Sequence, residues 1–296
     1  MPETANDSIM VTLLGTGCPR PLIERFGPST LIEAGGLRLL FDCGRGTMQR
    51  VYQVDNDTKD FDKIFLTHLH SDHTTGIPDL WITGTIYGRS ENPLRIWGPR
   101  GTVSMTSNLK KAFEIDNKVR TAHRIQFGSP TNRGGLRIVA EDMDEGFIFE
   151  ENGVNVAPFR VNHHDLYSDE PSLGYRIEYA GRSVVISGDT RFCENLIKFS
   201  ENVDLLIHEV LAGPMGEELP DRQKLPLTHH TLPEECGEIF SRVNPKLAVF
   251  YHYIQFQGVT LEDIMARTKN VYGGPVLFGE DLMKIEVGDS VNVLTS

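Results

Sequence analysis

The chain has 296 residues, of which 39% are hydrophobic, 24% charged and 8% aromatic, and its formal net charge is −12. This composition is typical of a soluble globular protein that is long enough to bury a sizeable core. The acidic balance and the scattered Lys and Arg residues argue against a nucleic-acid partner. No stretch reaches the roughly 20 apolar residues of a membrane span, so no membrane partner is expected.

In chain order, the apolar runs that predict strands are IMVTLLG, STLIEAGG, LRLLFDCG, KIFLT, LRIWG, VNVAPFRVN, LGYRIEYAG, SVVISGDT, DLLIHEV, LAVFYHY, PVLFG and MKIEVG. Helical patterns are GTMQRVYQV, GIPDLWITGTIYG, TVSMTSNLKKAFEI and the segments near 233–242 and 260–270. A polar, Gly-rich passage with short strands is expected between the third of these helices and residue 150. No low-complexity linker interrupts the chain, which favours one domain over residues 1–296.

The four cysteines are widely spaced and form no CxxC pair; they are Cys18, Cys43, Cys193 and Cys236. The first residues, MPETANDSIMVTLL, do not have the pattern of a secretory signal peptide. These two features predict reduced thiols and a cytoplasmic location.

A cluster of metal-type side chains follows the short apolar run KIFLT. Within six positions stand His68, His70, Asp72 and His73. Neutral imidazole and carboxylate are ligands that suit zinc and similar divalent metals. His68 and His70 are expected on one side of an extended strand end, because side chains alternate with period two, and can reach one metal. Asp72 and His73 follow after the chain turns and can face a second metal.

Further candidate ligands stand where later apolar strands end. VAPFRVNHHD ends in His163 and His164, SVVISGDT contains Asp189, and KLAVFYHY contains His252. A single histidine at a strand end is more often structural than metal-bound. Three such ends in one chain with the HxHxDH cluster favour a shared metal centre.

These segments resemble the metallo-β-lactamase superfamily, and in particular its ribonuclease Z-like branch of metal-dependent hydrolases. The resemblance rests on LLGTGCPRP, LLFDCGRGTMQR, THLHSDHTTGIPDL, VNHHDLYSDEPSLGYRIE, ISGDTRFC, LIHEV, HHTLPEECGEI and VFYHY, which stand in the family's order. It implies an α/β fold of the αββα type, in which two mixed β-sheets are flanked by helices. It also implies two divalent metal ions, expected to be Zn²⁺ with Mn²⁺ as the alternative.

By motif match, the resemblance assigns seven ligands to two metals. The first metal is held by His68, His70 and His163, the second by Asp72, His73 and His252, and Asp189 bridges both. His163 is preferred over His164 because it takes the family's histidine place at the strand end. Asp42 in FDCG is expected to accept the free ring N–H of a ligand histidine and to fix its orientation.

The expected chemistry is attack by a hydroxide that bridges the two metals, which Asp72 orients. A leaving group also needs a proton, and His230 is the predicted donor, with Glu209 in LIHEV holding it in the donor tautomer. His229 is the alternative donor. Thr231 before PEE is also a good start for a helix, and the two roles of this segment are compatible.

The substrate follows less directly from the residues. True ribonuclease Z enzymes carry a long arm that grips transfer RNA, inserted between the strand-end histidine and the bridging aspartate. Here His163 and Asp189 are only 26 residues apart, which leaves no room for that arm. The acidic net charge also argues against a large RNA substrate, because binding of RNA depends mainly on neutralising its phosphates. We therefore expect a small-molecule hydrolase of phosphodiesters, sulfate esters or lactones.

Three alternatives stay open: a transfer-RNA 3′-processing endonuclease of the ribonuclease Z type, a β-lactamase-like amide hydrolase, and an iron-dependent oxidoreductase on the same fold. Residues 84–150 are expected to form part of the cleft wall, with Trp81, Tyr87 and Phe147 as apolar lining unless they are core residues. A homodimer is expected because relatives often pair.

Overall fold

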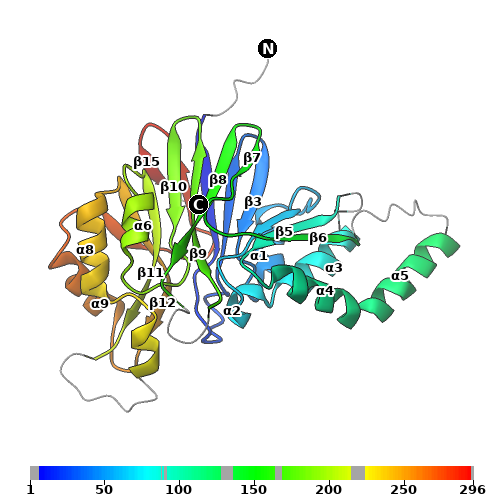
Figure 1. Ribbon diagram of the computed structural model, residues 1–296, viewed down its shortest axis with the longest axis horizontal. Helices are drawn as coiled ribbons and strands as arrows, with labels where there is room; N and C mark the ends of the chain where they lie inside the picture. Colours follow the sequence, from blue (N-terminus) through cyan, green and yellow to red (C-terminus); the bar gives the residue numbers. More distant parts are fainter. Residues whose placement is uncertain are drawn as a thin grey trace.

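The computed structural model describes residues 7–87, 89, 92–127, 136–163, 169–214 and 224–294. Two mixed β-sheets face each other at the centre of the molecule, and helices cover the outer side of each sheet (Figure 1). This is the αββα sandwich that the motifs predicted, so the predicted fold class is confirmed.

The first sheet has eight strands and contains the N-terminal half of the fold. In spatial order they are β15 (Val291–Leu294), β14 (Lys284–Val287), β1 (Ile9–Gly15), β2 (Ser29–Ala34), β3 (Leu37–Phe41), β4 (Lys63–Phe65), β5 (Leu94–Gly98) and β6 (Ile138–Asp142). The pairs from β15 to β3 are antiparallel, and those from β3 to β6 are parallel. The parallel half brings the carboxyl ends of its strands to one edge.

The second sheet has seven strands. In spatial order they are β13 (Val276–Phe278), β12 (Leu247–Gln255), β11 (Leu205–Ala212), β10 (Arg182–Ile186), β9 (Ser172–Tyr179), β8 (Val154–Val161) and β7 (Phe149–Glu151). The pairs from β13 to β10 are parallel, and those from β10 to β7 are antiparallel.

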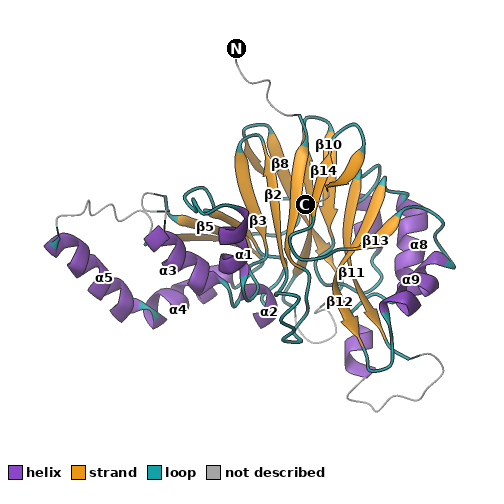
Figure 2. Cartoon of the chain, turned by 180° about the vertical axis from the view of Figure 1, so that it is seen from behind, coloured by secondary structure: helices purple, strands orange, loops and turns teal. Residues whose placement is uncertain are grey.

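Helices lie outside both sheets (Figure 2). Beside the first sheet are α1 (Thr47–Val54), α3 (Ile77–Tyr87), α4 (Thr102–Ala112) and α5 (Glu114–Gln126), and beside the second are α6 (Glu194–Phe199), α8 (Pro233–Val243) and α9 (Leu261–Lys269). Two short elements, α2 (Ser71–Thr74) and the 3₁₀ turn η1 (Leu225–Thr228), belong to connecting loops. None of the helices in the described part of the chain is long and apolar enough to cross a membrane.

The hydrophobic core between the sheets is built around aromatic side chains. Phe65 of β4 is fully buried and stacks on Phe41 and Trp97, with ring centroids 5.2 and 4.9 Å away. Phe65 stands three residues before His68, the first of the predicted ligands. The same packing that closes the sandwich therefore fixes the end of β4.

Replacing Phe65 by Ala is expected to lower the free energy of unfolding by about 3–5 kcal/mol, because a buried ring is lost and a cavity is left. Urea denaturation measures this change. Phe127→Ala is the matched control, since that ring is 78% exposed and its loss is expected to change stability by less than about 0.5 kcal/mol. Equal effects of the two substitutions would contradict this account of the core.

The start of α8 differs from the expectation for Thr231. The N-cap is Leu232, whose backbone N–H donates to Glu235 at 2.8 Å, and Pro233 takes the first helical position. The Thr231 hydroxyl instead donates to the carbonyl oxygen of Thr190, 2.6 Å away. Thr231 therefore does not cap the helix, because its hydroxyl is bonded to the loop that follows β10.

The passage after residue 115 also differs from the prediction. A helix, α5, occupies Glu114–Gln126 where a polar, Gly-rich passage with short strands was expected. No residue of α5 is buried. The prediction failed because the few apolar residues of this segment stand among many polar ones, so the segment was taken for a polar passage.

Candidate metal centre

The HxHxDH segment forms a tight loop and one helical turn at the end of β4. His68 and His70 stand in the loop, and Asp72 and His73 stand in α2. His68 and His73 are fully buried, Asp72 is nearly so, and His70 is exposed. The helical turn puts Asp72 and His73 in a second group of candidate ligand atoms directly beside the one that contains His68 and His70.

The remaining predicted ligands come from the second sheet. His163 follows β8 by two residues, Asp189 follows β10 by three, and His252 lies within β12. In Figure 1 the ends of these strands and α2 meet at the same lower edge of the sandwich. The site therefore bridges the two sheets.

His252 occupies a β-bulge. His208 of β11 pairs with Phe250 and Val210 pairs with Tyr253, so two residues of β12 oppose the single residue Glu209. His252 has a φ of +43°, and its N–H donates to the carbonyl oxygen of Thr16 at 2.8 Å. A bulge of this kind re-aims a side chain, and here it turns the imidazole of His252 toward the first sheet.

The seven side chains form two groups that share Asp189. In the first group, Nδ1 of His70 lies 3.0 Å from Nε2 of His68 and 3.2 Å from Nε2 of His163. Oδ2 of Asp189 lies 3.8 and 3.9 Å from these two Nε2 atoms. These four ligand atoms all lie within 4.8 Å of one another.

The second group contains Asp72, His73 and His252. Oδ2 of Asp72 lies 3.2 Å from Nε2 of His252 and 3.5 Å from Nε2 of His73. Asp189 reaches this group as well, since its Oδ1 lies 3.4 Å from Nε2 of His73 and its Oδ2 lies 3.4 Å from Nε2 of His252. Asp189 is thus placed between the two groups.

These separations fit a divalent metal in each group. Two ligand atoms that bind one tetrahedral zinc at about 2.1 Å lie about 3.4 Å apart, in the middle of the observed range. Nε2 of His73 and Oδ1 of Asp189 are buried and make no hydrogen bond within the described residues. A divalent cation would satisfy both of these atoms, so the residues present fit the metal that the site's chemistry implies.

The charge states of the buried side chains also suit binding of a divalent metal. Burial lowers the pKa of His68 well below its usual value, so this imidazole is neutral, the form that binds metals. Burial also opposes the charge on Asp189, but the neighbouring His252 and His73 outweigh it and hold the pKa of this carboxyl well below its usual range. The bridging position thus carries a carboxylate.

Outer hydrogen bonds orient the ring nitrogens. Oδ2 of Asp42 lies 2.8 Å from Nδ1 of His73, and Thr67 donates to the same carboxylate through its backbone N–H at 2.8 Å. Nδ1 of His163 lies 2.9 Å from the carbonyl oxygen of His229. In both histidines Nε2 is left to face the group. The role expected of Asp42 matches this geometry.

Asp42→Asn is expected to weaken metal binding in the second group by about 10–100-fold, because the orienter of His73 loses its charge. Competition with a chromophoric chelator measures the affinity. Asp204→Asn is the matched control, since Asp204 is also buried but bonds the backbone of Ser183 elsewhere in the second sheet. Equal loss of metal affinity in both variants would contradict an orienting role.

His230 lies beside the groups and against Glu209. Nδ1 of His230 is 3.0 Å from Oε1 of the fully buried Glu209, which also accepts the backbone N–H of Thr190 at 3.0 Å. A ring nitrogen of His230 also lies within 4.8 Å of ligand atoms of Asp189 and His252. Burial alone lowers the pKa of His230, but the Glu209 carboxylate outweighs burial and raises that pKa to about 9.

The two rival histidines are placed differently. The His229 side chain is only partly buried, Thr228 Oγ1 lies 3.0 Å from its Nδ1, and its backbone carbonyl oxygen lies 2.9 Å from Nδ1 of His163. His164 lies outside the described residues. The contact predicted between Glu209 and a histidine of this segment is thus made by His230.

A cleft of about 370 Å³ opens over the first group. Its walls come from the loop after β1, η1 and the end of β12; the lining residues are Gly17, Cys18, Pro19, Arg20, Leu22, Arg25, His70, His163, Pro226, His229, His230, Tyr253, Ile254 and Gln255. No acidic residue is among them, and two are arginines. The cleft therefore suits an anionic substrate.

Among the described residues, none from the expected wall segment 84–150 lines this cleft, and Trp81 does not line it either. Trp81 is a fully buried core residue of α3, Phe147 packs against the core between the sheets, and Tyr87 is exposed beside α1. The sequence did not identify Arg20, Arg25 and the rest of the loop after β1 as part of the cleft wall. The only sequence feature that pointed to this loop was the pair of arginines close to the LGTG motif.

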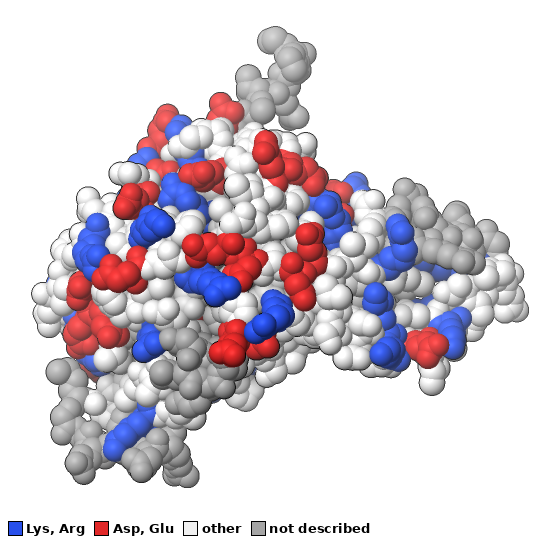
Figure 3. Space-filling view, viewed as in Figure 1, with Lys and Arg blue, Asp and Glu red and all other residues white. Residues whose placement is uncertain are grey.

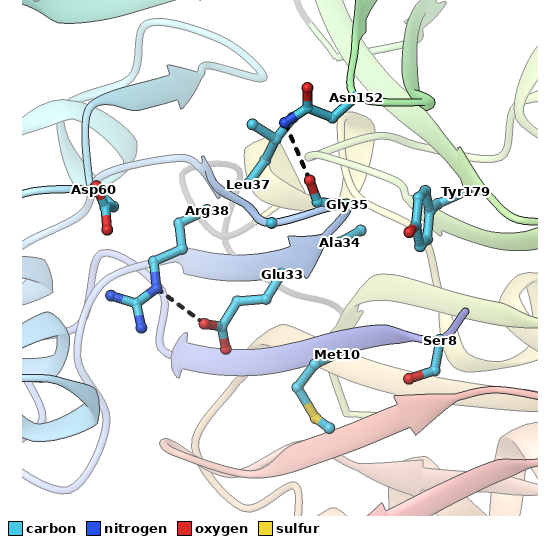
Figure 4. A pocket seen from close by; sticks show the side chains of 11 residues that line it. Ser8, Met10, Glu33, Ala34, Gly35, Leu37, Arg38, Asp60, Asn152 and Tyr179 are labelled. Atoms are coloured by element: carbon cyan, nitrogen blue, oxygen red, sulfur yellow. Dashed lines mark hydrogen bonds and ion pairs between the residues drawn. The ribbon is translucent and has the colours of Figure 1, made fainter. Parts of the chain in front are cut away.

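A larger cavity, of about 750 Å³, lies away from this centre (Figure 4). Its lining includes Ser8, Glu33, Arg38, Asn152 and Tyr179. The carboxylate of Glu33 pairs with Arg38 at 3.0 Å. None of the metal-type side chains of the centre reaches this cavity, so size alone does not locate the chemistry.

Comparison with known proteins agrees with the fold. Residues 37–253 match the β-lactamase superfamily domain. A protein named ribonuclease Z from Mycolicibacterium gilvum (strain PYR-GCK) is 34% identical over 287 residues, which cover 96% of this chain and 98% of the relative. A protein of the same name from Mycobacterium marinum is 33% identical over 285 residues, covering 94% and 99%.

Two solved structures share the fold. The metallo-β-lactamase fold protein YhfI from Bacillus subtilis superposes with a TM-score of 0.73 at 20% identity, covering 95% of this chain and all of that one. The short form of human tRNase Z superposes with a TM-score of 0.67 at 24% identity, covering 93% and 98%.

The fold and the site together define a metal-dependent hydrolase. The chain belongs to the metallo-β-lactamase superfamily, in its ribonuclease Z-like branch.

Proposed function

We propose that this protein is a phosphodiesterase of the ribonuclease Z type, which cleaves precursor transfer RNA on the 3′ side. The observation that carries the proposal is the end-to-end alignment with relatives of that name, at 33–34% identity and over at least 94% of this chain. An alignment that covered only part of the chain would support the fold alone. An alignment over at least 94% of the chain extends across the segments that supply the predicted ligands.

The chemistry of the site supports a phosphodiester substrate. Seven ligands, His68, His70, Asp72, His73, His163, Asp189 and His252, would hold two divalent metals, for which zinc is our proposal. Metals in such a site stabilise charge on a phosphoryl oxygen and acidify a bound water. Asp72 would accept a hydrogen bond from the attacking water as well as bind metal.

His230 would supply the proton that the leaving oxygen needs. Its Nδ1 faces Glu209, so the proton to be donated is held at Nε2. The raised pKa keeps the ring protonated at neutral pH. Glu209 acts through His230, so it is a positioning residue.

The short interval between His163 and Asp189 first argued against transfer RNA. The Mycolicibacterium relative aligns over 98% of its own length with 96% of this chain, so the two chains are nearly equally long. A long additional arm is therefore not required for a protein to bear that name. The net charge of −12 is also a weak argument, because phosphate binding depends on where the positive charges lie.

A substrate panel with metal-loaded protein tests the proposal. We expect cleavage of a precursor transfer RNA with a 3′ extension, and slower turnover of bis(p-nitrophenyl) phosphate. An aryl sulfate, a homoserine lactone and nitrocefin represent the other hydrolytic classes. Turnover of one of these three without cleavage of the RNA would overturn the proposal, and elemental analysis of the same sample would distinguish zinc from manganese or iron.

A further inference from the structure

The most prominent projection of the described chain is a pair of helices between β5 and β6. We call residues 101–127, which contain α4 and α5, the helical wing. In Figures 1 and 2 the wing extends away from the sandwich. We infer that the helical wing is the surface that binds the body of the RNA substrate, an inference that rests on the proposed function.

The wing begins next to the metal loop. Gly101, at the start of α4, has a φ of +103°, and a Cβ atom at this position would lie 3.0 Å from Cδ1 of Leu69. Leu69 stands between His68 and His70 in the chain. Asp142 fixes this end of the helix by accepting the N–H of Val103 at 2.8 Å. The wing is therefore anchored at the site and leads away from it.

The length of the wing suits contact with nucleotides outside the cleft. With 11 residues in α4 and 13 in α5, the two helices are about 16 and 20 Å long. The cleft of about 370 Å³ has room for only a short part of an RNA chain. A folded RNA must continue outward from the cleft, and the wing begins against Leu69, the neighbour in sequence of the cleft residue His70.

The charge of the wing is opposite to that of the whole protein. It carries five basic residues, Lys110, Lys111, Lys118, Arg120 and Arg124, and two acidic residues, Glu114 and Asp116, a net of +3 in a chain of net −12. Figure 3 shows blue side chains gathered over the wing, whereas red ones are frequent on the sandwich. A local positive surface on an acidic protein is the pattern expected for phosphate binding.

The two lysines at the end of α4 are the most available of these charges. Lys118 pairs with Glu114 at 2.6 Å, and Arg120 pairs with Asp116 at 2.7 Å. Lys110 and Lys111 are exposed and make no ion pair within the described residues.

The face of α5 also indicates a partner. Ile115, Val119, Ile125 and Phe127 are 48–78% exposed. The helix is held at its ends, where Phe113 packs on Trp81 and Arg124 donates to the carbonyl oxygen of Thr85 at 3.3 Å. A second copy of this chain is the competing partner. Three of these apolar side chains lie in α5 and Phe127 directly follows it, so they are few for an interface that buries roughly 1,200 Å², and the net positive charge of the wing favours RNA.

The double substitution K110E/K111E tests the inference. We expect the KM for precursor transfer RNA to rise about tenfold or more, with kcat unchanged, because two phosphate contacts become repulsive. The slope of log affinity against log salt is expected to fall by about two. Turnover of bis(p-nitrophenyl) phosphate is expected to stay the same, since that substrate does not extend beyond the cleft.

The matched control is K198E/K284E, which makes the same change in net charge at exposed lysines on α6 and β14. Equal effects of the two double substitutions, or no effect of K110E/K111E on an enzyme that cleaves the RNA, would overturn the inference alone. Sedimentation could also show that the unmodified protein is a dimer and that K110E/K111E is a monomer. If the affinity for RNA were unchanged at the same time, the wing would be the contact with a second copy of this chain. If the unmodified protein does not cleave the RNA, the proposed function fails and the inference fails with it.

Discussion

Asp189→Asn is expected to reduce hydrolysis of bis(p-nitrophenyl) phosphate by about a thousandfold or more. The carboxylate of Asp189 lies 3.4–3.9 Å from Nε2 of all four of His68, His73, His163 and His252. A neutral amide in this place would hold two cations poorly, because the negative charge that faces both groups is lost. Losing one preorganised electrostatic contact already costs about a hundredfold to a thousandfold in rate, and this change affects two groups.

Metal content measured on the same samples separates a missing metal from a misfolded chain. We expect Asp189→Asn to retain less than the two metals per chain expected of the unmodified protein, with an unchanged circular dichroism spectrum. Asp142→Asn is the control, because Asp142 caps α4 and contacts no predicted ligand. A fully active, fully metal-loaded Asp189→Asn protein would exclude the bridging role.

The second large effect is expected for His230→Ala, and it should depend on the leaving group. A positioned general acid contributes about 10²–10⁴-fold, so cleavage of precursor transfer RNA, whose leaving oxygen is a poorly stabilised alkoxide, should fall by that factor. Hydrolysis of bis(p-nitrophenyl) phosphate should fall by less than about tenfold, because p-nitrophenolate leaves without a proton. Steady-state kinetics on both substrates measures the contrast.

Glu209→Gln provides the matched pH test. The donor must be protonated, so the rate is expected to fall as the pH rises through the pKa of His230, which Glu209 raises to about 9. Removing the negative charge lowers that pKa, and the falling limb of the pH profile should move to lower pH. Equal losses on both substrates in His230→Ala, or a falling limb that stays in place in Glu209→Gln, would show that His230 serves the structure or the metal instead.

The predicted ligands could be identified from the sequence because each stands in a local pattern. His68, His70, Asp72 and His73 share one segment, and His163, Asp189 and His252 each end an apolar run. The grouping of these residues into one centre was an expectation that came from the family resemblance of the motifs, and it required no knowledge of distances.

Other features were beyond the sequence because they depend on contacts between distant segments. The position of Thr231 outside the helix depends on Thr190, and the wall of the cleft depends on how the loop after β1 meets the end of β12. The aromatic residues Trp81 and Phe147 were expected near the cleft and are packed elsewhere. An aromatic side chain gives the same sequence signal in a core and in a pocket.

The sequence by itself determined the candidate ligand cluster, and through the resemblance that its motifs carry it indicated the class of fold, the branch of the family and the seven side chains, because motifs are properties of short segments. The tertiary structure decided that Asp189 lies between two groups, that the bulge in β12 aims His252, and that Glu209 meets His230 and not His229. It also revealed the helical wing beside the metal loop. These features depend on how the two sheets pack face to face, and segments far apart in the chain acquire fixed distances only through that packing.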